Sequence, residues 1–208
     1  MARYAGPDCR LCRRAGQKLF LKGERCFMPK CAVDRRHSPP GQIAQRRRRV
    51  SDRGLQLREK QKAKVMYGVL ERQFRGYFDK ARKNPLSTGE VLVQLLERRL
   101  DNVVFRLDFA ESRDQARQLV RHGHIMVSGK KVSIPSYLVK PGDVVGWKQS
   151  SQEKEFAKAV AAQIPRKAIP GWLNLEASTM MGRVVDLPAM AAIEGLVETR
   201  MIIEFYSK

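Results

Sequence analysis

Apolar residues recur at three- and four-residue spacing through much of the segment 51–107, a pattern typical of amphipathic helices. Ser51–Asp52 is suited to cap the first helix, and Tyr67–Gly68 favours a break that divides it into two. Asn84–Pro85 ends the second helix, because the residue before a proline avoids helical backbone angles. Ser87–Glu90 then has the capping-box pattern of a further helix. Its apolar face predicts core positions at Leu92, Leu95, Leu96, Leu100, Val103, Val104 and Leu107.

The pattern between residues 112 and 147 changes from helix to strand. Ser112 and Gln115 have capping-box spacing, and Gly123 is suited to the left-handed position that ends a helix. His124–Val127 then predicts a strand. The next segments predict, in order, a hairpin turn at Ser128–Lys131, a return strand at Val132–Ile134, a turn at Pro141–Asp143 and a strand at Val144–Trp147.

The C-terminal tail ends in Met201–Tyr206, an apolar run with the pattern of a closing strand. We expect this tail to fold back on earlier elements, because chain termini often lie close together.

The 208 residues have an ordinary globular content of 43% hydrophobic residues but a formal net charge of +20. Such a charge attracts polyanions, which makes nucleic acid the leading class of partner. No apolar run approaches the ~18 residues needed to cross a bilayer, so we expect no membrane span. The opening MARYAGPD lacks the apolar region of a signal peptide, which favours a reducing compartment.

The positive charge is concentrated in the first part of the chain, with a formal net charge of +17 over residues 1–84, +3 over 85–150 and 0 over 151–208. Its densest run is Arg46, Arg47, Arg48 and Arg49, which we expect to contact phosphate; a solvated tail or a localisation signal is the alternative. Cations of the predicted helices are also expected to contact phosphate, namely Arg53, Arg58, Lys60, Lys62, Lys64, Arg72 and Arg75. The alternative is that they form an ordinary solvated surface over a packed core.

All four cysteines lie near the N-terminus, as Cys9, Cys12, Cys26 and Cys31. Two close pairs with this spacing suit one tetrahedral ion, and four thiolates favour a structural zinc. Four protein ligands leave no open position, so such an ion would organise the fold and do no chemistry. A disulfide pair and a redox-active C-x-x-C are less consistent with the sequence, and an iron–sulfur cluster is the minor alternative.

The segment SRDQARQLVRHGHIMVSGKKV, followed by IPSYLVKPGDVV, resembles the S-four RNA-binding domain. Nearly the whole chain resembles the bacterial small-subunit (30S) ribosomal protein S-four family in its zinc-binding, four-cysteine form. The segments that carry this resemblance are CRLCRR, CFMPKC, PPGQ, RLDNVVFRL and the final IIEFYSK.

The resemblance implies a structural protein, not an enzyme, that binds small-subunit ribosomal RNA directly near its five-prime end. It further implies that the protein nucleates small-subunit assembly and affects decoding accuracy near the mRNA entry channel. The implied partners are ribosomal RNA, neighbouring small-subunit proteins and the mRNA path, with no small-molecule substrate. The implied location is the small ribosomal subunit in the cytoplasm.

Pattern and resemblance together predict an α+β fold with a four-cysteine zinc arm, a helical domain and an S-four-type domain of helices and antiparallel sheet. We expect the zinc arm at residues 1–45 and the basic helical domain at 46–97, completed by 191–208. The S-four RNA-binding domain with its C-terminal extension would then occupy 98–190, as an insertion in the helical domain.

The S-four motif falls on Ser112, Arg113, Ala116, Arg117, Leu119, Val120, Gly123, Ile125, Val127, Gly129 and Val132. The family usually has Asn where this chain has Ser128, which leaves the hairpin turn type open. His122 and His124 could instead be ordinary surface imidazoles without a role in binding, and for His124 we favour that interpretation. The predicted RNA-contacting residues of the module are Ser112, Arg113, Arg117, Gln118, Arg121, His122, Lys130 and Lys131.

Two other classes of protein are compatible with parts of this sequence. An RNA-modifying enzyme with an accessory S-four domain would need a catalytic site, and no phosphate-binding loop or catalytic triad is recognisable outside the module. A zinc-dependent DNA-binding regulator would share the positive charge, because charge alone does not distinguish DNA from RNA.

Overall fold

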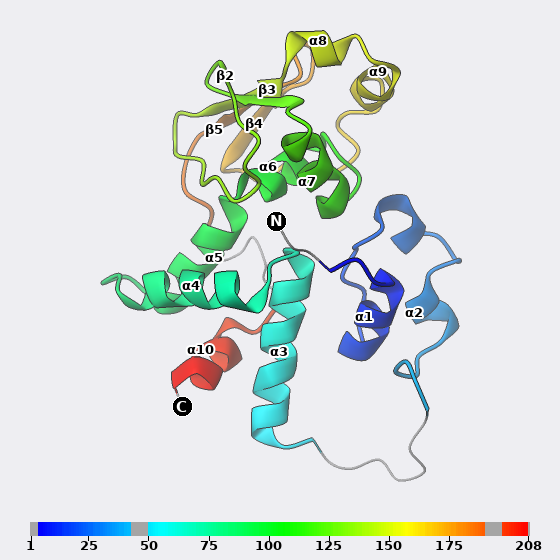
Figure 1. Ribbon diagram of the computed structural model, residues 1–208, viewed down its shortest axis with the longest axis vertical. Helices are drawn as coiled ribbons and strands as arrows, with labels where there is room; N and C mark the ends of the chain where they lie inside the picture. Colours follow the sequence, from blue (N-terminus) through cyan, green and yellow to red (C-terminus); the bar gives the residue numbers. More distant parts are fainter. Residues whose placement is uncertain (1–3, 43–49, 190–196, 208) are drawn as a thin grey trace. The chain divides into compact units, whose positions relative to one another are not determined.

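The computed structural model describes residues 4–42, 50–189 and 197–207. The chain forms two compact units, one of Met1–Gly89 with Ile193–Lys208 and one of Glu90–Ala192 (Figure 1). The domain boundaries expected from the sequence stay predictions.

The first unit begins with short elements joined by turns: α1 (Asp8–Ala15), the 3-10 helix η1 (Gly23–Cys26) and α2 (Ala32–Arg35). α1 ends at Gly16, whose left-handed backbone (φ 77°) directs its N–H to the Cys12 carbonyl. This cap fixes the turn that follows the first cysteine pair.

The larger helices of the first unit are α3 (Asp52–Met66), α4 (Glu71–Arg82) and α10 (Thr199–Ser207). The Ser51 hydroxyl accepts a hydrogen bond from the Gly54 N–H (3.2 Å), so the predicted cap is confirmed. The predicted break is also confirmed, because Gly68 adopts a left-handed conformation (φ 60°) between α3 and α4.

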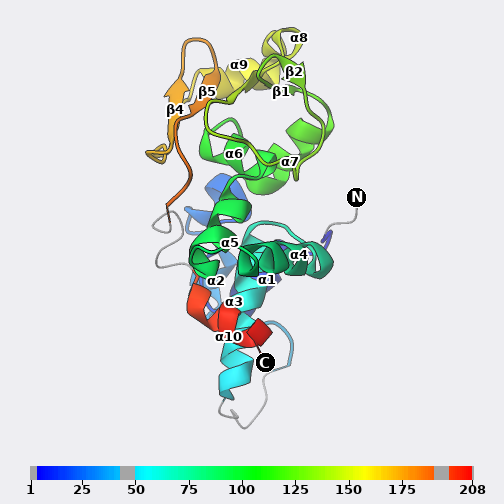
Figure 2. The same ribbon diagram turned by 90° about the vertical axis from the view of Figure 1, so that its left-hand side faces the viewer.

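The predicted closing strand at Met201–Tyr206 is wrong, because these residues form α10, which lies beside α3 (Figure 2). Ile202 is buried, and the Tyr206 ring stacks on Phe78 with centroids 4.6 Å apart. Ile202 and Tyr206 are four residues apart, a spacing that places them on one face of a helix and equally on one face of a strand. A short apolar run supports either period, and packing against α3 selects the helix.

The second unit contains α5 (Thr88–Glu97, which spans the boundary between the units), α6 (Leu100–Arg106) and α7 (Arg113–Arg121). Two short helices follow the first strands: α8 (Gln149–Gln152) and α9 (Glu155–Ala161). An antiparallel sheet has the strand order β2-β1-β3-β5-β4. The strands are β1 (Ile125–Val127), β2 (Lys130–Lys131), β3 (Val144–Trp147), β4 (Leu173–Glu176) and β5 (Met181–Val184).

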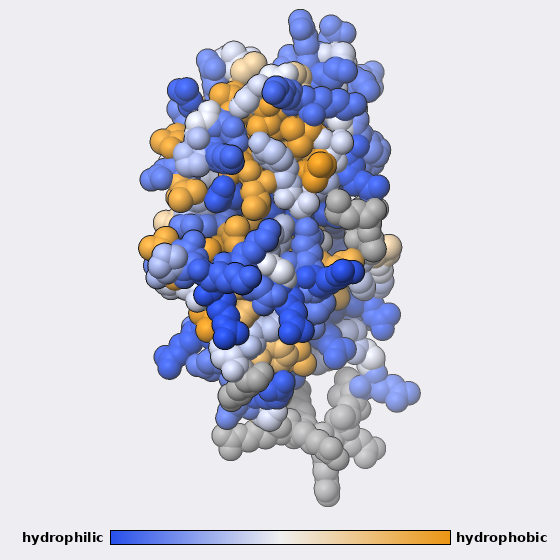
Figure 3. Space-filling model, turned by 60° about the vertical axis from the view of Figure 1, so that its left-hand side comes forward, coloured by the Kyte–Doolittle hydropathy of each residue, from blue (hydrophilic) through white to orange (hydrophobic). Residues whose placement is uncertain are grey.

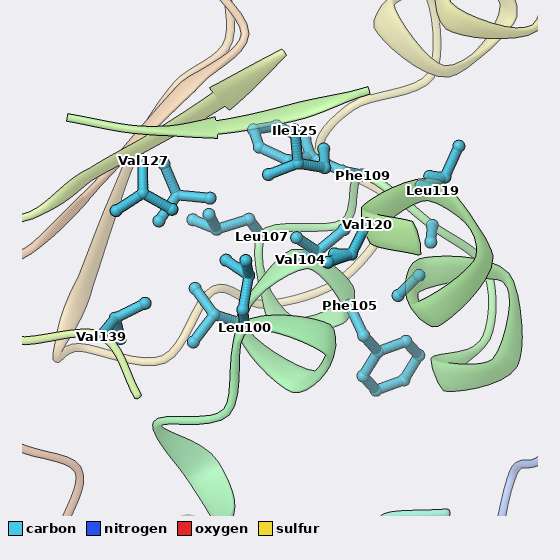
Figure 4. Close-up of a cluster of buried hydrophobic side chains, with 14 of the residues drawn as sticks. Leu100, Val104, Phe105, Leu107, Phe109, Leu119, Val120, Ile125, Val127 and Val139 are labelled. Atoms are coloured by element: carbon cyan, nitrogen blue, oxygen red, sulfur yellow. The ribbon is translucent and has the colours of Figure 1, made fainter. Parts of the chain in front are cut away.

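The core of this unit lies between the sheet and helices α6 and α7 (Figure 4). Leu100, Val104 and Leu107 from the helical side meet Ile125 and Val127 of β1, and all five are essentially inaccessible to solvent. The predicted α+β class with helices and an antiparallel sheet is therefore confirmed. Within residues 4–42, 50–189 and 197–207, no helix has the length and apolar character needed to cross a membrane.

The hairpin differs from its prediction by two residues. Only Ser128 and Gly129 form the turn, both with left-handed backbones (φ 46° and 78°). Lys130, the first residue of β2, pairs with Val127, the last residue of β1. Two left-handed central residues are the pattern of a type I′ turn. Residues 132–134, predicted as the return strand, are not a strand. The Ser128 hydroxyl helps to hold this turn by accepting from the Val144 N–H (3.4 Å).

Candidate nucleic-acid interface

The end of α7 and the β1–β2 hairpin lie close together and carry exposed cations. The Lys131 side chain lies directly across Gly123, which follows α7 and has no Cβ to obstruct it. The residues next to this contact in the sequence are exposed, namely Arg121, His122 and Lys130. Gln118 is exposed on α7. We refer to Arg121, His122, Lys130 and Lys131 as the hairpin patch.

His124 lies half-buried close to His122 of the hairpin patch. Burial is the largest cause that lowers its pKa, and the nearby positive charges of Lys154, His122, Lys131 and Lys148 lower it further. Its Nδ1 lies 3.0 Å from the Ser151 hydroxyl, a partner that the sequence did not reveal. Sequence reasoning missed Lys148 and Lys154, whose proximity depends on how the chain returns past β3.

Arg117, predicted from the sequence to contact RNA, does not belong to the exposed surface. Its side chain is only 6% exposed and its Nη1 lies 3.1 Å from Asp101 Oδ2. Arg99 contacts the same carboxylate at 2.6 Å, and both of these partners are buried. The α7 face that carries Arg117 is therefore the one that meets α6.

Arg113 and Ser112, also predicted to contact RNA, have structural contacts at the start of α7. The Ser112 hydroxyl accepts from the Gln115 N–H (3.3 Å), which confirms the predicted cap. Arg113 donates to the Asn102 side chain (2.8 Å) and lies 4.5 Å from the centroid of the Phe105 ring. Ser112, Arg113 and Arg117 thus make contacts within the protein, although all three were predicted to contact RNA.

The cations of α3 and α4 divide in a similar way. Arg53, Arg58, Arg72 and Arg75 are exposed, as the phosphate-contact prediction requires. Lys60 is instead buried: its Nζ lies 2.6 Å from Glu71 and 4.6 Å from the centroid of the Phe205 ring. Lys62 and Lys64 are partly buried and pair with Glu59 (2.7 Å) and Glu71 (3.4 Å).

Exposed cations at the end of α4, namely Lys80, Arg82 and Lys83, were missed in the sequence, although their position in the last turn was readable. The space-filling view of one face shows strongly hydrophilic side chains over much of its surface, with apolar patches between them (Figure 3). The run Arg46, Arg47, Arg48 and Arg49 lies outside the described residues.

A cavity of about 700 Å³ lies between α1 and α3 in the first unit. Apolar side chains form much of its wall, and three cations also line it: Arg14, Arg58 and Lys62. Arg58 thereby lies near a cation of the cysteine-containing segment, a proximity that the sequence does not reveal.

The four cysteines are free, and Cys12, Cys26 and Cys31 are buried. Burial is the main cause that raises the pKa of the Cys12 and Cys26 thiols, and charge on the other cysteines raises both further. The four thiols are therefore close enough to interact. Across residues 4–42, 50–189 and 197–207, however, no three His, Cys, Asp or Glu side chains already have an arrangement that could hold a metal ion.

Comparison with known proteins agrees with this architecture. Residues 3–97 match the "Ribosomal protein S4/S9 N-terminal domain" family, and residues 98–145 match the "S4 domain" family. Proteins named "Small ribosomal subunit protein uS4" are similar over the whole of both chains. Examples come from Pelotomaculum thermopropionicum (55% identity), Thermodesulfovibrio yellowstonii (55%) and Halothermothrix orenii (53%).

The helical unit and the helix-and-sheet unit thus define a two-part protein with an S4 domain. The chain belongs to the uS4 family of small ribosomal subunit proteins.

Proposed function

We propose that this protein is a structural component of the small ribosomal subunit that binds small-subunit ribosomal RNA directly. Full-length identity of 55% to proteins of that name is the observation that carries the proposal. The protein acts by binding, without catalysis, and its location is the cytoplasmic small subunit, beside other ribosomal proteins. The family resemblance extends its role to early subunit assembly and to decoding near the mRNA entry channel.

The hairpin patch provides suitable chemistry for this binding. A-form RNA presents phosphates and 2′-hydroxyls more openly than base edges, so exposed cations on a rigid surface suit its shape. Arg121, Lys130 and Lys131 are exposed donors on such a surface, and their charges are not neutralised by an ion pair with a described carboxylate. Arg117 is not part of this proposal, because Asp101 holds it.

The two alternative classes lose support from the same comparisons. A modifying enzyme would need a catalytic domain besides its S4 domain, whereas relatives named as ribosomal proteins match this chain from end to end. A DNA-binding regulator would share only the charge.

Filter binding to a small-subunit rRNA transcript, with duplex DNA as competitor at matched salt, tests the proposal. Arg121→Ala with Lys131→Ala should lower RNA affinity more than Lys158→Ala with Arg183→Ala, a matched pair of exposed cations on α9 and β5. Equal losses from the two pairs would show that diffuse charge, and not the hairpin patch, attracts RNA. Equal affinity of the parent for DNA and RNA would contradict the function itself.

We also propose that Cys9, Cys12, Cys26 and Cys31 bind one structural zinc. The C-x2-C and C-x4-C pairs support this, as does the Lys22 N–H, which donates to Cys26 Sγ (3.3 Å). The thiols would have to deprotonate and draw closer to bind the ion, so metal binding would be coupled to folding of this segment.

Elemental analysis of the purified protein should give one zinc per chain, and Cys26→Ser with Cys31→Ser should abolish it. Iron together with visible absorbance would instead indicate an iron–sulfur cluster. Metal that is retained in the double variant would contradict the proposed ligands.

A further inference from the structure

An aromatic pair in the cysteine-containing segment is not used by the hairpin patch or by the proposed zinc ligands. The Phe20 and Phe27 rings are stacked, with centroids 5.0 Å apart and an angle of 26° between their planes. Phe27 is 68% exposed, more than any other large apolar side chain in the described part of the chain. Its outer face is therefore open to a flat ligand.

The local backbone holds this pair in place. Phe20 has a left-handed backbone (φ 51°), which is unfavourable for an aromatic residue and persists only where the surroundings impose it. Phe27 directly follows the buried Cys26, and its N–H donates to the Glu24 carbonyl (2.9 Å) at the end of η1. The ring of Phe27 is thus presented by a hydrogen-bonded turn, with Phe20 supporting it from behind.

The charge around the pair favours one kind of ligand. Lys22, Arg25 and Lys30 are all exposed within five residues of Phe27, and Glu24 is the one acidic residue of that stretch. An exposed aromatic ring among cations is the combination that binds unpaired nucleotides: the cations attract the phosphates and the ring stacks on a base. An apolar protein surface would fill the ring face equally well but would not use the positive charge.

We propose that Phe27, supported by Phe20, stacks on an unpaired base of the ribosomal RNA. This inference rests on the proposed RNA-binding function and adds a second contact, remote in sequence from the hairpin patch. Because stacking releases no counterions, it should contribute to affinity without contributing to its salt dependence.

The test uses full-length protein as purified, filter-bound to a small-subunit rRNA transcript over a range of salt concentrations. Phe27→Ala and Phe27→Leu should each lower affinity about 5- to 150-fold at every salt concentration, with an unchanged slope of log affinity against log salt. Phe27→Trp should retain the parent affinity. Leu86→Ala removes another exposed apolar side chain (58% exposed) and should have no effect.

Three results of the binding assay would overturn the inference. These are parent affinity in Phe27→Ala, parent affinity in Phe27→Leu, or a changed salt slope in either variant. Parent affinity in Phe27→Leu would indicate a non-aromatic apolar contact, as with a protein partner. Failure of the parent itself to prefer rRNA would contradict the proposed function, which is a distinguishable outcome.

Fluorescence of Phe27→Trp provides an independent readout, because stacking of an indole on a base quenches its emission. The native Trp147 and Trp172 are buried (3% and 7% exposed), so parent protein supplies the baseline. The rRNA transcript should quench the additional emission of the variant. Bound RNA that leaves this additional emission unchanged would show that residue 27 does not stack. Circular dichroism and metal content confirm that each variant is folded.

Discussion

Arg117 Nη1 lies 3.1 Å from Asp101 Oδ2, joining α7 to α6 through an ion pair between two buried side chains. Asp101 also accepts two hydrogen bonds from Arg99, at 3.0 and 2.6 Å. One carboxylate thus pairs with two buried guanidinium groups. A basic residue that sequence reasoning assigned to RNA is part of the internal structure of the S4 domain.

Arg117→Ala should therefore destabilise the protein by about 1–3 kcal/mol, because it leaves part of a buried carboxylate without a donor. Arg99 remains as a partner, which keeps the cost below that of an isolated buried charge. Arg121→Ala, one helical turn further along α7 and exposed, should change stability by less than about 0.5 kcal/mol. Urea unfolding at neutral pH measures both; equal effects would contradict the assignment of Arg117 to the core.

Asp101→Ala should have a larger effect than either arginine variant. It leaves Arg99 and Arg117 buried together without their shared carboxylate, and removal of one partner from a buried pair costs about 3–5 kcal/mol. The same urea titration tests this order of stabilities. A variant as stable as Arg117→Ala would mean that the two guanidinium groups find other acceptors.

Gly182 in β5 predicts a steric effect. A Cβ at this position would collide with the Leu107 side chain, which is fully buried in the core of the S4 domain. Gly182→Ala should cost about 1–3 kcal/mol through overpacking. Gly171→Ala is the matched control, because nothing lies within 4 Å of the added Cβ there. If both variants unfold at the parent's urea midpoint, Leu107 moves aside without cost.

The contact between α4 and α10 predicts a pH dependence of stability. Burial acts to raise the pKa of Glu71, but hydrogen bonds from Lys60 and Tyr206 and the charges of Lys60 and Lys64 outweigh it, so the pKa lies below its usual 4.5. A lowered carboxyl pKa stabilises the folded state above pH 4.5, and this contribution is lost as the pH falls through the folded-state pKa.

The difference in unfolding free energy between the parent and Glu71→Gln should therefore favour the parent at pH 7 and shrink below pH 4.5. Urea titrations at several pH values measure this difference. A difference that is constant with pH would show that Glu71 acts through its shape and not through its charge.

The arginine run predicts a change in salt dependence. Replacement of Arg46, Arg47, Arg48 and Arg49 by Gln should flatten the slope of log RNA affinity against log salt by up to about four units, because each lost phosphate contact removes roughly one. Filter binding over a salt series measures the slope. An unchanged slope would identify the run as a solvated segment.

Local signals in the sequence were reliable where a residue acts through its own backbone. Ser51 and Ser112 cap their helices, and Gly68 and Gly123 adopt left-handed backbones, as their types and positions predict. The hairpin and the C-terminal element were less predictable. The register of Lys130 depends on its pairing with Val127, and the helical form of residues 201–206 depends on α3.

The sequence by itself determined the helix caps and breaks, the class of fold, the excess of positive charge and the family, because these depend on residue types and their spacing. Only the tertiary structure decided which cations face solvent. Arg117 and Arg121 are the same residue type one helical turn apart, yet one is held by Asp101 and the other is exposed. A buried cation requires a carboxylate, and which carboxylate lies within reach depends on how separate segments pack.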